Sequence, residues 1–403
     1  MEVYVARQPV FRKNRKVYGY ELLFRDGISN CFPSIDGDLA TSKILSNAFL
    51  SIGIEEITGG APAFINFTEK LLVERVPLLL SPGLVLVEIL EDIKPTPDLL
   101  QACREMQEKG FTLVLDDFTY RPDLQDLIAL SKIVKLDFRA TDPEELKWSV
   151  RKLAAYPVSL LAEKVETHEE VEKADQMGFS LFQGYFFSRP EVLVGRDISS
   201  SQMALMQIMA EANKEEVEFR KLEAVMGRDV AISYKLMRYV NSAFFRRVNQ
   251  ISSIKQAIIM LGERQIRQFI SLIAMSQLSS DKPSELIRSS IVRAKFCELL
   301  GSSNGNSIDA SELFTLGLFS MIDAILDKPM EEIMERLPLS APMKEALVDG
   351  KGRLSDYLSL SISYERGEWE RASSTANNLG LAFEVLPGCF KDALGWANAF
   401  AGL

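Results

Sequence analysis

The sequence predicts two domains of different class: an α/β barrel over residues 1–197 and an all-helical domain over residues 198–403. A chain of 403 residues is long for one domain and suits two, each large enough to bury its own core. In the first half, short apolar runs alternate with helical segments, whereas in the second half apolar residues recur only at helical spacing. The change of pattern falls near residues 188–201.

Six apolar runs of the first half predict buried parallel strands. Continuous apolar strands separated by helices indicate βαβ units, and six or more units within about 200 residues favour a (β/α) barrel over an open sheet. One intervening helix is marked at both ends, because Thr96 can cap its start and Gly110 its end. The runs are APAFINF (61–67), GLVLVEIL (83–90), FTLVLDD (111–117), KIVKLDF (132–138), VSLLAEKVE (158–166) and FSLFQGYFF (179–187).

The second half predicts helices with an apolar stripe. Ser252 or Ser253 can cap a helix that begins near residue 254. The other predicted helices cover residues 199–219, 264–278, 283–301 and 312–326.

Composition narrows the classes of function. A formal charge of −10 argues against binding to the phosphate backbone of DNA or RNA, and the small basic cluster RKNRK (12–16) fits a solvated surface. The four cysteines show no metal-type spacing and fit a reducing compartment. No run of about 18 apolar residues and no signal peptide is evident, so we expect a cytoplasmic protein that does not enter a membrane.

Polar side chains stand at the ends of the strand-like segments. In a (β/α) barrel these ends converge on one rim, where functional sites form. Carboxylate and carboxamide oxygens gathered there suit hard divalent cations such as Mg²⁺ or Mn²⁺, and two adjacent aspartates could serve two metals. Each residue alone also fits a polar strand end or a helix N-cap, an interpretation that their number disfavours. The residues are Glu21, Asn66, Glu88, Glu91, Asp116, Asp117, Lys135, Asp137, Glu163, Glu166 and Gln183.

These residues carry a resemblance to a known family. ELLFR (21–25) is similar to the E-A-L-x-R motif of the EAL family, the barrel phosphodiesterases that open cyclic di-GMP to the linear dinucleotide pGpG. The resemblance covers roughly residues 1–195 and implies an EAL-type (β/α) barrel. The other motifs that resemble the family are FINF (64–67), VEILE (87–91), DDF (116–118), KLD (135–137), AEKVE (162–166) and QGYFFSRP (183–190).

The resemblance implies a role for each matching residue. Asp117 and Glu163 would hold a second metal and the attacking water, which Lys135 would position. Arg25 would contact a substrate phosphate, and we assign Gln183 and Glu166 to the substrate side of the site. The ligands of the first metal would be Glu21, Asn66, Glu88 and Asp116.

Three departures from the family pattern lie beside these residues. The signature alanine is Leu22, and the glycine of A-E-G-V-E is Lys164. The family's Gly-rich loop after the aspartate pair, which takes part in dimerisation, is replaced by TYRPDL (119–124), whose proline and lack of glycine restrict its backbone. Because the groups that aim the ligands have changed, we expect weak or lost hydrolysis and leave open whether this half is an enzyme.

The second half resembles the HDOD domain, a relative of HD-type metal phosphohydrolases. The resemblance is carried by YKLMRYVNSAFF (234–245), ISSIKQAIIMLG (251–262) and LFTLGLFSMID (313–323). A catalytic HD site requires several histidines, whereas this chain has one, His168, which we expect to be exposed early in a helix of the first half. Ser320 and Met321 stand where active relatives carry His-Asp. The resemblance therefore implies a non-catalytic module for protein–protein signalling.

The leading hypothesis is a bacterial EAL–HDOD signalling protein whose barrel binds cyclic di-GMP with weak or lost hydrolysis. Its helical half would report to an unidentified protein partner, and a homodimer is plausible. One alternative is an active Mg²⁺- or Mn²⁺-dependent phosphodiesterase that makes pGpG. Another is a scaffold that binds no nucleotide.

Overall fold

The computed structural model describes residues 4–25, 53–188, 236–241, 251, 254–278, 282–303, 308–337 and 339–401. The chain divides into two compact units, residues 1–187 with residues 364–369, and residues 188–363 with residues 370–403. The predicted boundary between residues 197 and 198 lies outside the described residues and stays a prediction.

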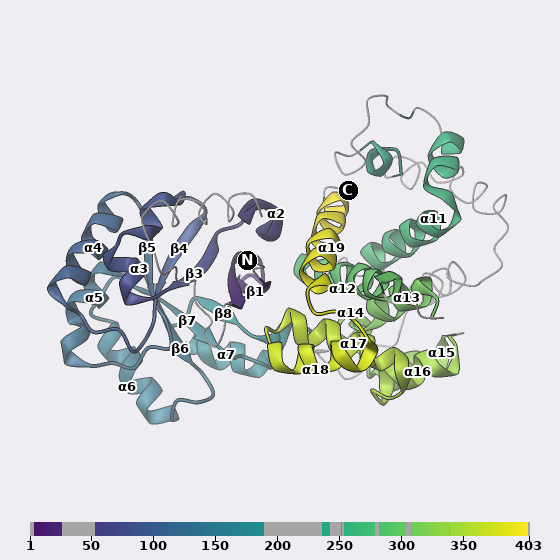
Figure 1. Ribbon diagram of the computed structural model, residues 1–403. Coiled ribbons are helices and arrows are strands. Elements are labelled where there is room, and N and C mark those ends of the chain that lie inside the picture. The colour runs from purple at the N-terminus through teal and green to yellow at the C-terminus, as the bar shows by residue number, and fades with distance from the viewer. Residues whose placement is uncertain are drawn as a thin grey trace. The chain divides into compact units, whose positions relative to one another are not determined.

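Eight strands close into one barrel in which each strand pairs with its neighbours in chain order, as Figure 1 shows. All six apolar runs form strands of this barrel, which confirms the predicted α/β barrel. The strands are β1 (Tyr4–Arg12), β2 (Val17–Arg25), β3 (Ala63–Phe67), β4 (Val85–Ile89), β5 (Thr112–Leu115), β6 (Ile133–Asp137), β7 (Ser159–Glu163) and β8 (Leu181–Gln183).

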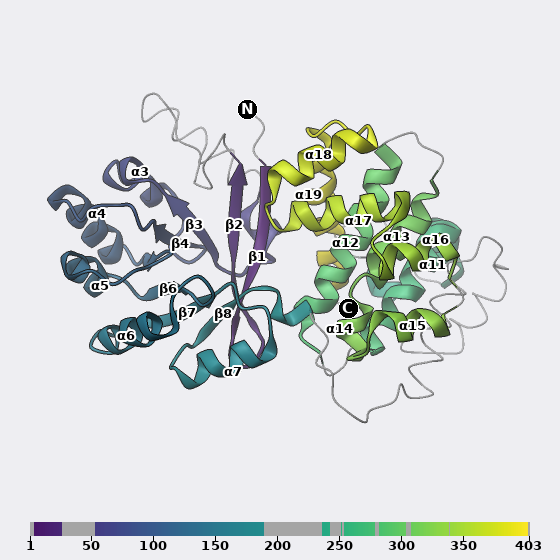
Figure 2. The same cartoon turned by 90° about the horizontal axis from the view of Figure 1, so that it is seen from below.

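The first two strands depart from the parallel pattern. β1 runs antiparallel to both β2 and β8, whereas every pair from β2 to β8 is parallel. β1 and β2 form a long hairpin (Figure 2), and its turn holds the basic residues 12–16, which are exposed as predicted. The sequence did not predict this hairpin.

The barrel interior is filled by a layer of apolar side chains. Residues alternate in direction along a strand, so each strand except β2 sends one side chain of this layer inward and its neighbours outward. The layer consists of Val10, Phe64, Leu86, Val114, Ile133, Leu161 and Leu181.

Helices connect the parallel strands and surround the barrel (Figure 1). Thr96 caps α4 by accepting a hydrogen bond from the Leu99 backbone nitrogen, and Gly110 beyond its end has a φ of 89°, as the predicted helix signals require. The helical segments are α2 (Ile54–Thr58), α3 (Glu69–Val73), η1 (Val76–Leu79), α4 (Pro97–Glu108), η2 (Pro122–Leu124), α5 (Gln125–Leu130), α6 (Pro143–Leu153), α7 (His168–Gln176) and η3 (Tyr185–Ser188).

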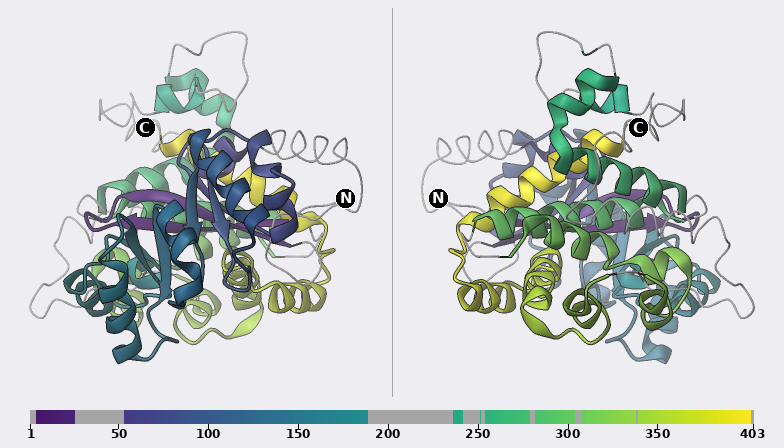
Figure 3. Two further views of the ribbon diagram at one scale, coloured as in Figure 1. Left: turned by 90° about the vertical axis from the view of Figure 1, so that its left-hand side faces the viewer. Right: turned by 90° about the vertical axis from the view of Figure 1, so that its right-hand side faces the viewer.

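Among its described residues, the second unit consists of helices joined by turns and short connections, without a strand (Figure 3). Buried aromatic side chains pack edge-on in its core. The ring centroids of Phe296 and Phe390 are 5.3 Å apart, and those of Phe314 and Trp396 are 5.7 Å apart. Its helices are α11 (Ile254–Leu278), α12 (Ser284–Ser303), α13 (Ala310–Phe319), α14 (Ile322–Leu326), α15 (Met330–Arg336), α16 (Ala341–Val348), α17 (Gly352–Glu365), α18 (Trp369–Leu379) and α19 (Val385–Ala401).

The predicted helices of this unit need two qualifications. The single helix predicted over residues 312–326 is wrong, because the chain breaks at Ser320 and Met321 into α13 and α14. The helix predicted over residues 199–219 and the caps at Ser252 and Ser253 lie outside the described residues. None of the helices that the structure describes combines the length and the apolar character needed to cross a bilayer.

Candidate functional site

Strand alternation places a ring of polar side chains above the apolar layer. On six parallel strands, the residue two positions after the inward apolar side chain is polar, so it points to the same side at the carboxyl end of the barrel. Six of the sequence-predicted site residues occupy these positions. The pairs are Phe64 and Asn66, Leu86 and Glu88, Val114 and Asp116, Ile133 and Lys135, Leu161 and Glu163, and Leu181 and Gln183.

Glu21 joins this ring from β2. Two residues before it, Gly19 approaches the neighbouring strand so closely that a Cβ atom there would lie 2.6 Å from the Pro62 carbonyl oxygen and 3.0 Å from the Phe64 ring. A side chain at Gly19 would therefore push β2 away from β3 and withdraw Glu21 from the ring.

Lys135 lies at the centre of the ring and is fully buried. Its ammonium group is within ion-pair distance of four carboxylates, each on a different strand. The distances from Nζ are 2.6 Å to Asp116 Oδ1, 2.9 Å to Glu88 Oε1, 3.0 Å to Glu163 Oε1 and 3.3 Å to Glu21 Oε2. We call Glu21, Asn66, Glu88, Asp116, Lys135 and Glu163 the barrel cluster.

The barrel cluster contains one ammonium group and four carboxylates, so its negative charge is only partly neutralised. Burial alone would lower the pKa of Lys135, but the four carboxylates outweigh burial and hold that pKa well above its usual value. Burial raises the pKa of Glu88 well above the usual range and that of Glu163 to about 8, and the neighbouring carboxylates add to both effects. One ammonium group therefore does not neutralise four buried carboxylates, and the cluster favours the uptake of protons or of a cation.

The donor atoms of the barrel cluster fit a hard divalent cation. One oxygen atom each of Glu21, Glu88 and Asp116 lies within 4.8 Å of the other two. One end of the Asn66 carboxamide lies 3.2 Å from both Glu88 Oε2 and Asp116 Oδ2. With nitrogen there Asn66 donates two hydrogen bonds, and with oxygen there it adds a fourth oxygen ligand, which suits Mg²⁺ or Mn²⁺.

A second observation supports this fit. Oε2 of Glu163 is buried, and no donor among the residues that the structure describes reaches it. A buried carboxylate oxygen without a donor is costly unless water or a cation satisfies it. The predicted first-metal ligands Glu21, Asn66, Glu88 and Asp116 are thus brought together, with Glu163 beside them.

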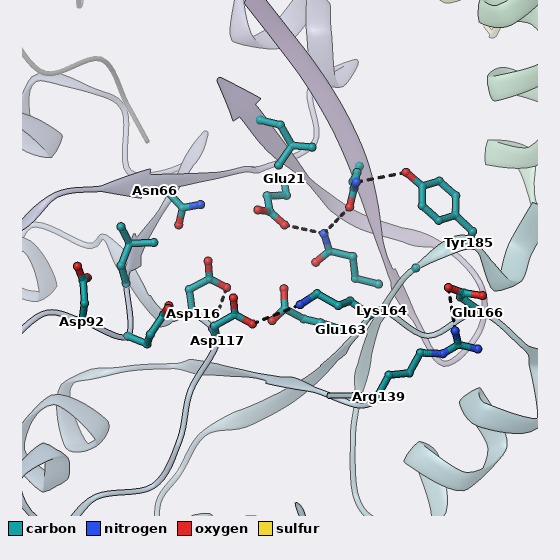
Figure 4. A pocket seen from close by; sticks show the side chains of 16 residues that line it. Glu21, Asn66, Asp92, Asp116, Asp117, Arg139, Glu163, Lys164, Glu166 and Tyr185 are labelled. Atoms are coloured by element: carbon teal, nitrogen blue, oxygen red, sulfur yellow. Dashed lines mark hydrogen bonds and ion pairs between the residues drawn. The ribbon is translucent and has the colours of Figure 1, made fainter. Parts of the chain in front are cut away.

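A pocket of about 600 Å³ opens above the barrel cluster (Figure 4). Its wall includes the predicted residues Asp117, Glu163, Glu166 and Gln183. Sequence reasoning missed further lining residues, among them Gln8, Arg139 and Tyr185.

Gln183 links the cluster to the pocket wall. Its Nε2 atom donates to Glu21 Oε2 at 2.6 Å and to Gln8 Oε1 at 3.2 Å, and Gln8 in turn donates to the Tyr185 hydroxyl at 3.2 Å (Figure 4). Gln183 thereby orients Glu21, and Oε1 of Gln183 has no donor among the described residues. Gln8 could have been found from its place two residues before the inward-facing Val10 on an antiparallel strand.

Asp117 lies at the edge of the pocket rather than inside the barrel cluster. Its φ of 40° turns the chain, and its side chain is 46% exposed. Lys164 Nζ lies 3.8 Å from Asp117 Oδ1 and also donates to Asp137 Oδ2. The Lys164 ammonium group therefore joins Asp117 to Asp137 at the rim, and Glu163 is the residue before it in the chain.

Glu166 is engaged with a cation of the protein. Its carboxylate pairs with Arg139 at 2.9 Å (Figure 4). Arg139 also pairs with Glu170 at 3.0 Å. The Arg139 guanidinium is a group on this wall that suits a phosphate, and the substrate-side role of Glu166 stays a prediction. The Arg25 side chain, predicted to contact a phosphate, lies outside the described residues.

Two of the sequence departures leave the pocket unobstructed. Leu22 is buried on the outer side of β2, because it alternates with the inward-facing Glu21, so its larger side chain does not meet the ligands. The TYRPDL loop turns away from the site. Tyr120 packs edge-on against Trp148 with ring centroids 5.3 Å apart, and none of residues 119–124 is among the described pocket lining.

His168 differs from its prediction. It begins α7, as expected for a residue early in a helix, but it is half-buried rather than exposed. Its ring meets Phe186 edge-on, with centroids 6.0 Å apart.

In the helical unit, an arginine from α12 contacts Ser320, one of the two residues that replace the His-Asp pair of active relatives. The buried Arg293 donates to Ser320 Oγ at 3.0 Å, and that hydroxyl donates to the Gly317 carbonyl at 2.7 Å. Ser320 thus closes the end of α13 by hydrogen bonding, and Met321 is buried in the apolar core.

Comparison with known proteins finds relatives of both halves. A model of the EAL domain matches residues 38–190, and a model of the HDOD domain matches residues 198–339. A Vibrio cholerae protein named cyclic di-GMP phosphodiesterase CdgJ is 38% identical, with 98% of this chain and 92% of that protein covered. The Bacillus subtilis protein YuxH is 36% identical, with 99% and 98% covered.

Among solved structures, the EAL domain of Mycobacterium smegmatis DcpA covers 45% of this chain and 90% of its own, at 19% identity and a TM-score of 0.35. That similarity is too low to identify a shared fold by itself. The two relatives, by contrast, match nearly the whole length of the chain, and the EAL and HDOD models match consecutive segments. The chain therefore belongs to the family of proteins that join an EAL barrel to an HDOD domain.

Proposed function

We propose that the barrel binds cyclic di-GMP together with a divalent cation and hydrolyses it to pGpG. The observation that carries this proposal is the barrel cluster, in which one buried lysine faces four carboxylates on four strands beneath an open pocket. The name of the 38% identical Vibrio cholerae relative supports the choice of substrate.

Glu21, Asn66, Glu88 and Asp116 would hold the cation, for which we expect Mg²⁺ or Mn²⁺. When bound, such a cation supplies Lewis acidity at a phosphodiester oxygen. Three of the four ligands, Glu21, Asn66 and Asp116, line the pocket, so a dinucleotide in the pocket would present one phosphodiester to them.

The protein's own groups supply the remaining chemistry. Glu163 Oε2 is a buried acceptor without a donor among the described residues, so it can accept a hydrogen bond, and then a proton, from an attacking water. Lys135 contacts both Asp116 and Glu163 and neutralises part of their charge. Arg139 and Lys164 place positive charge on the pocket wall, where phosphate oxygens would lie.

A second candidate function is binding of cyclic di-GMP with weak or lost hydrolysis. The contact of Lys164 with Asp117 favours it, because an ammonium group there competes with a second metal.

For the helical domain we propose a role in protein–protein signalling. The support is that Ser320 and Met321 are used in hydrogen bonding and packing, not presented as ligands. The identity of the partner, a homodimer and a cytoplasmic location stay predictions.

The test is calorimetric titration of the full chain with cyclic di-GMP in Ca²⁺, followed by chromatography for pGpG in Mg²⁺ or Mn²⁺. We expect binding in Ca²⁺ and pGpG in Mn²⁺, with no product from Glu21→Ala. The matched control is Glu144→Ala, which removes a carboxylate that is 81% exposed on α6 and should leave product formation unchanged. Binding without product would favour the second candidate, and no binding would overturn both.

A further inference from the structure

Lys164 has an unusual backbone conformation at the edge of the candidate site. It follows Glu163 directly at the end of β7 and adopts a φ of 57°, in the left-handed region that favours glycine. A residue with a Cβ atom is strained in that conformation, and the strain is accepted where the side chain has a role.

The side chain of Lys164 is directed at two aspartates of the rim. Its ammonium group donates to Asp137 Oδ2 and lies 3.8 Å from Asp117 Oδ1 (Figure 4 shows the second contact). Asp137 is held in place for this contact, since its other oxygen accepts hydrogen bonds from the backbone nitrogens of Arg139 and Ala140, both at 2.8 Å. Only Oδ2 of Asp137 remains for a cation, and Lys164 binds it.

The negative charges of Asp117 and Asp137 are therefore partly neutralised by the Lys164 ammonium group. Burial by itself favours the neutral acid at Asp137, but the Ala140 and Arg139 amides and Lys164 outweigh it and hold its pKa below the usual value. The hydrogen bond to Asp137 raises the pKa of Lys164, so the side chain is charged. A divalent cation placed between Asp117 and Glu163 would lie close to this ammonium group and be repelled by it.

We propose that the Lys164 ammonium group takes the place of a second metal, so that the pocket binds one divalent cation per chain. Lys164 then supplies the second positive charge beside the phosphodiester from the protein itself. This inference rests on the proposed function of the barrel cluster as a cation site.

Manganese binding to the full chain tests this directly. Equilibrium dialysis with Mn²⁺ alone gives the number of ions per chain, and electron paramagnetic resonance detects the spin coupling of two neighbouring Mn²⁺ ions. Lys164→Ala removes the ammonium group, whereas Lys164→Arg keeps the charge. Lys147→Ala removes an exposed lysine of α6 and serves as the matched control.

We expect one Mn²⁺ in the unsubstituted protein, in Lys164→Arg and in Lys147→Ala. In Lys164→Ala we expect a second Mn²⁺, bound at least about tenfold more tightly than any second ion of the unsubstituted protein, with a spin-coupled signal. Two coupled ions in the unsubstituted protein, or one ion in Lys164→Ala, would overturn the inference while leaving the proposed function intact. No bound ion in any variant would overturn the proposed function as well.

Discussion

Lys135 is the residue whose removal tests the charge balance of the barrel cluster most severely. Lys135→Met keeps a long side chain but leaves four carboxylates, on Glu21, Glu88, Asp116 and Glu163, without their ammonium partner. Breaking a buried ion pair by removing one partner costs about 3–5 kcal/mol. Proton uptake relieves part of this cost, since the pKa values of Glu88 and Glu163 are already raised, so we expect a loss of about 3 kcal/mol in the metal-free barrel.

Hydrogen exchange of peptides from β5 and β6 in the presence of EDTA measures this loss in the barrel independently of the helical unit. A loss of about 3 kcal/mol corresponds to about 100-fold faster exchange wherever exchange requires opening of the barrel. The control is Lys132→Met, which alters an exposed lysine just before β6. Exchange that is unchanged in Lys135→Met, or equally fast in the control, would refute the assigned charge balance.

Three further predictions follow from the same geometry. Asn66→Ala should weaken Mn²⁺ binding by about 10–100-fold in competition with a fluorescent chelator, and an unchanged affinity would remove Asn66 from the ligand set. Because burial raises the pKa of Glu163 to about 8, the metal-free cluster holds that proton at neutral pH. Mn²⁺ binding should therefore release about one proton and strengthen as the pH rises towards 8; equal calorimetric heats in buffers of different ionisation enthalpy would contradict this. Gly317→Ala should destabilise the helical unit by about 1–3 kcal/mol in thermal unfolding and leave barrel exchange unchanged, because its Cβ would lie 2.6 Å from the Ala294 Cα atom; an unchanged melting temperature would contradict the close approach of α12 and α13.

The barrel and most of the candidate site could be predicted from the sequence. Each apolar run places a polar residue two positions after an inward apolar one, as Phe64 precedes Asn66 and Leu86 precedes Glu88. Because parallel strands end at the same rim, local patterns in distant segments predict residues that meet in space. The ion pairs of Lys135 show the outcome, since they join it to carboxylates from four other strands.

Other features depend on information that local patterns do not carry. The strand Tyr4–Arg12 has no continuous apolar run, and closure of the barrel decides its antiparallel direction. The direction of Lys164 follows from its positive φ, which the residue type disfavours. The helix breaks at Ser320 because Ser320 forms hydrogen bonds with Arg293 and with the Gly317 carbonyl. The helical spacing of apolar residues continues through Ser320, so the sequence pattern does not reveal this break.

The measurement that tests the central claim most directly is anomalous diffraction from crystals of the full chain grown with Mn²⁺ and cyclic di-GMP. We predict a manganese peak at the base of the pocket, coordinated by Glu21, Asn66, Glu88 and Asp116, with a phosphodiester beside it. A nucleotide bound elsewhere, or a cluster in which Lys135 still contacts all four carboxylates and no manganese is present, would contradict it.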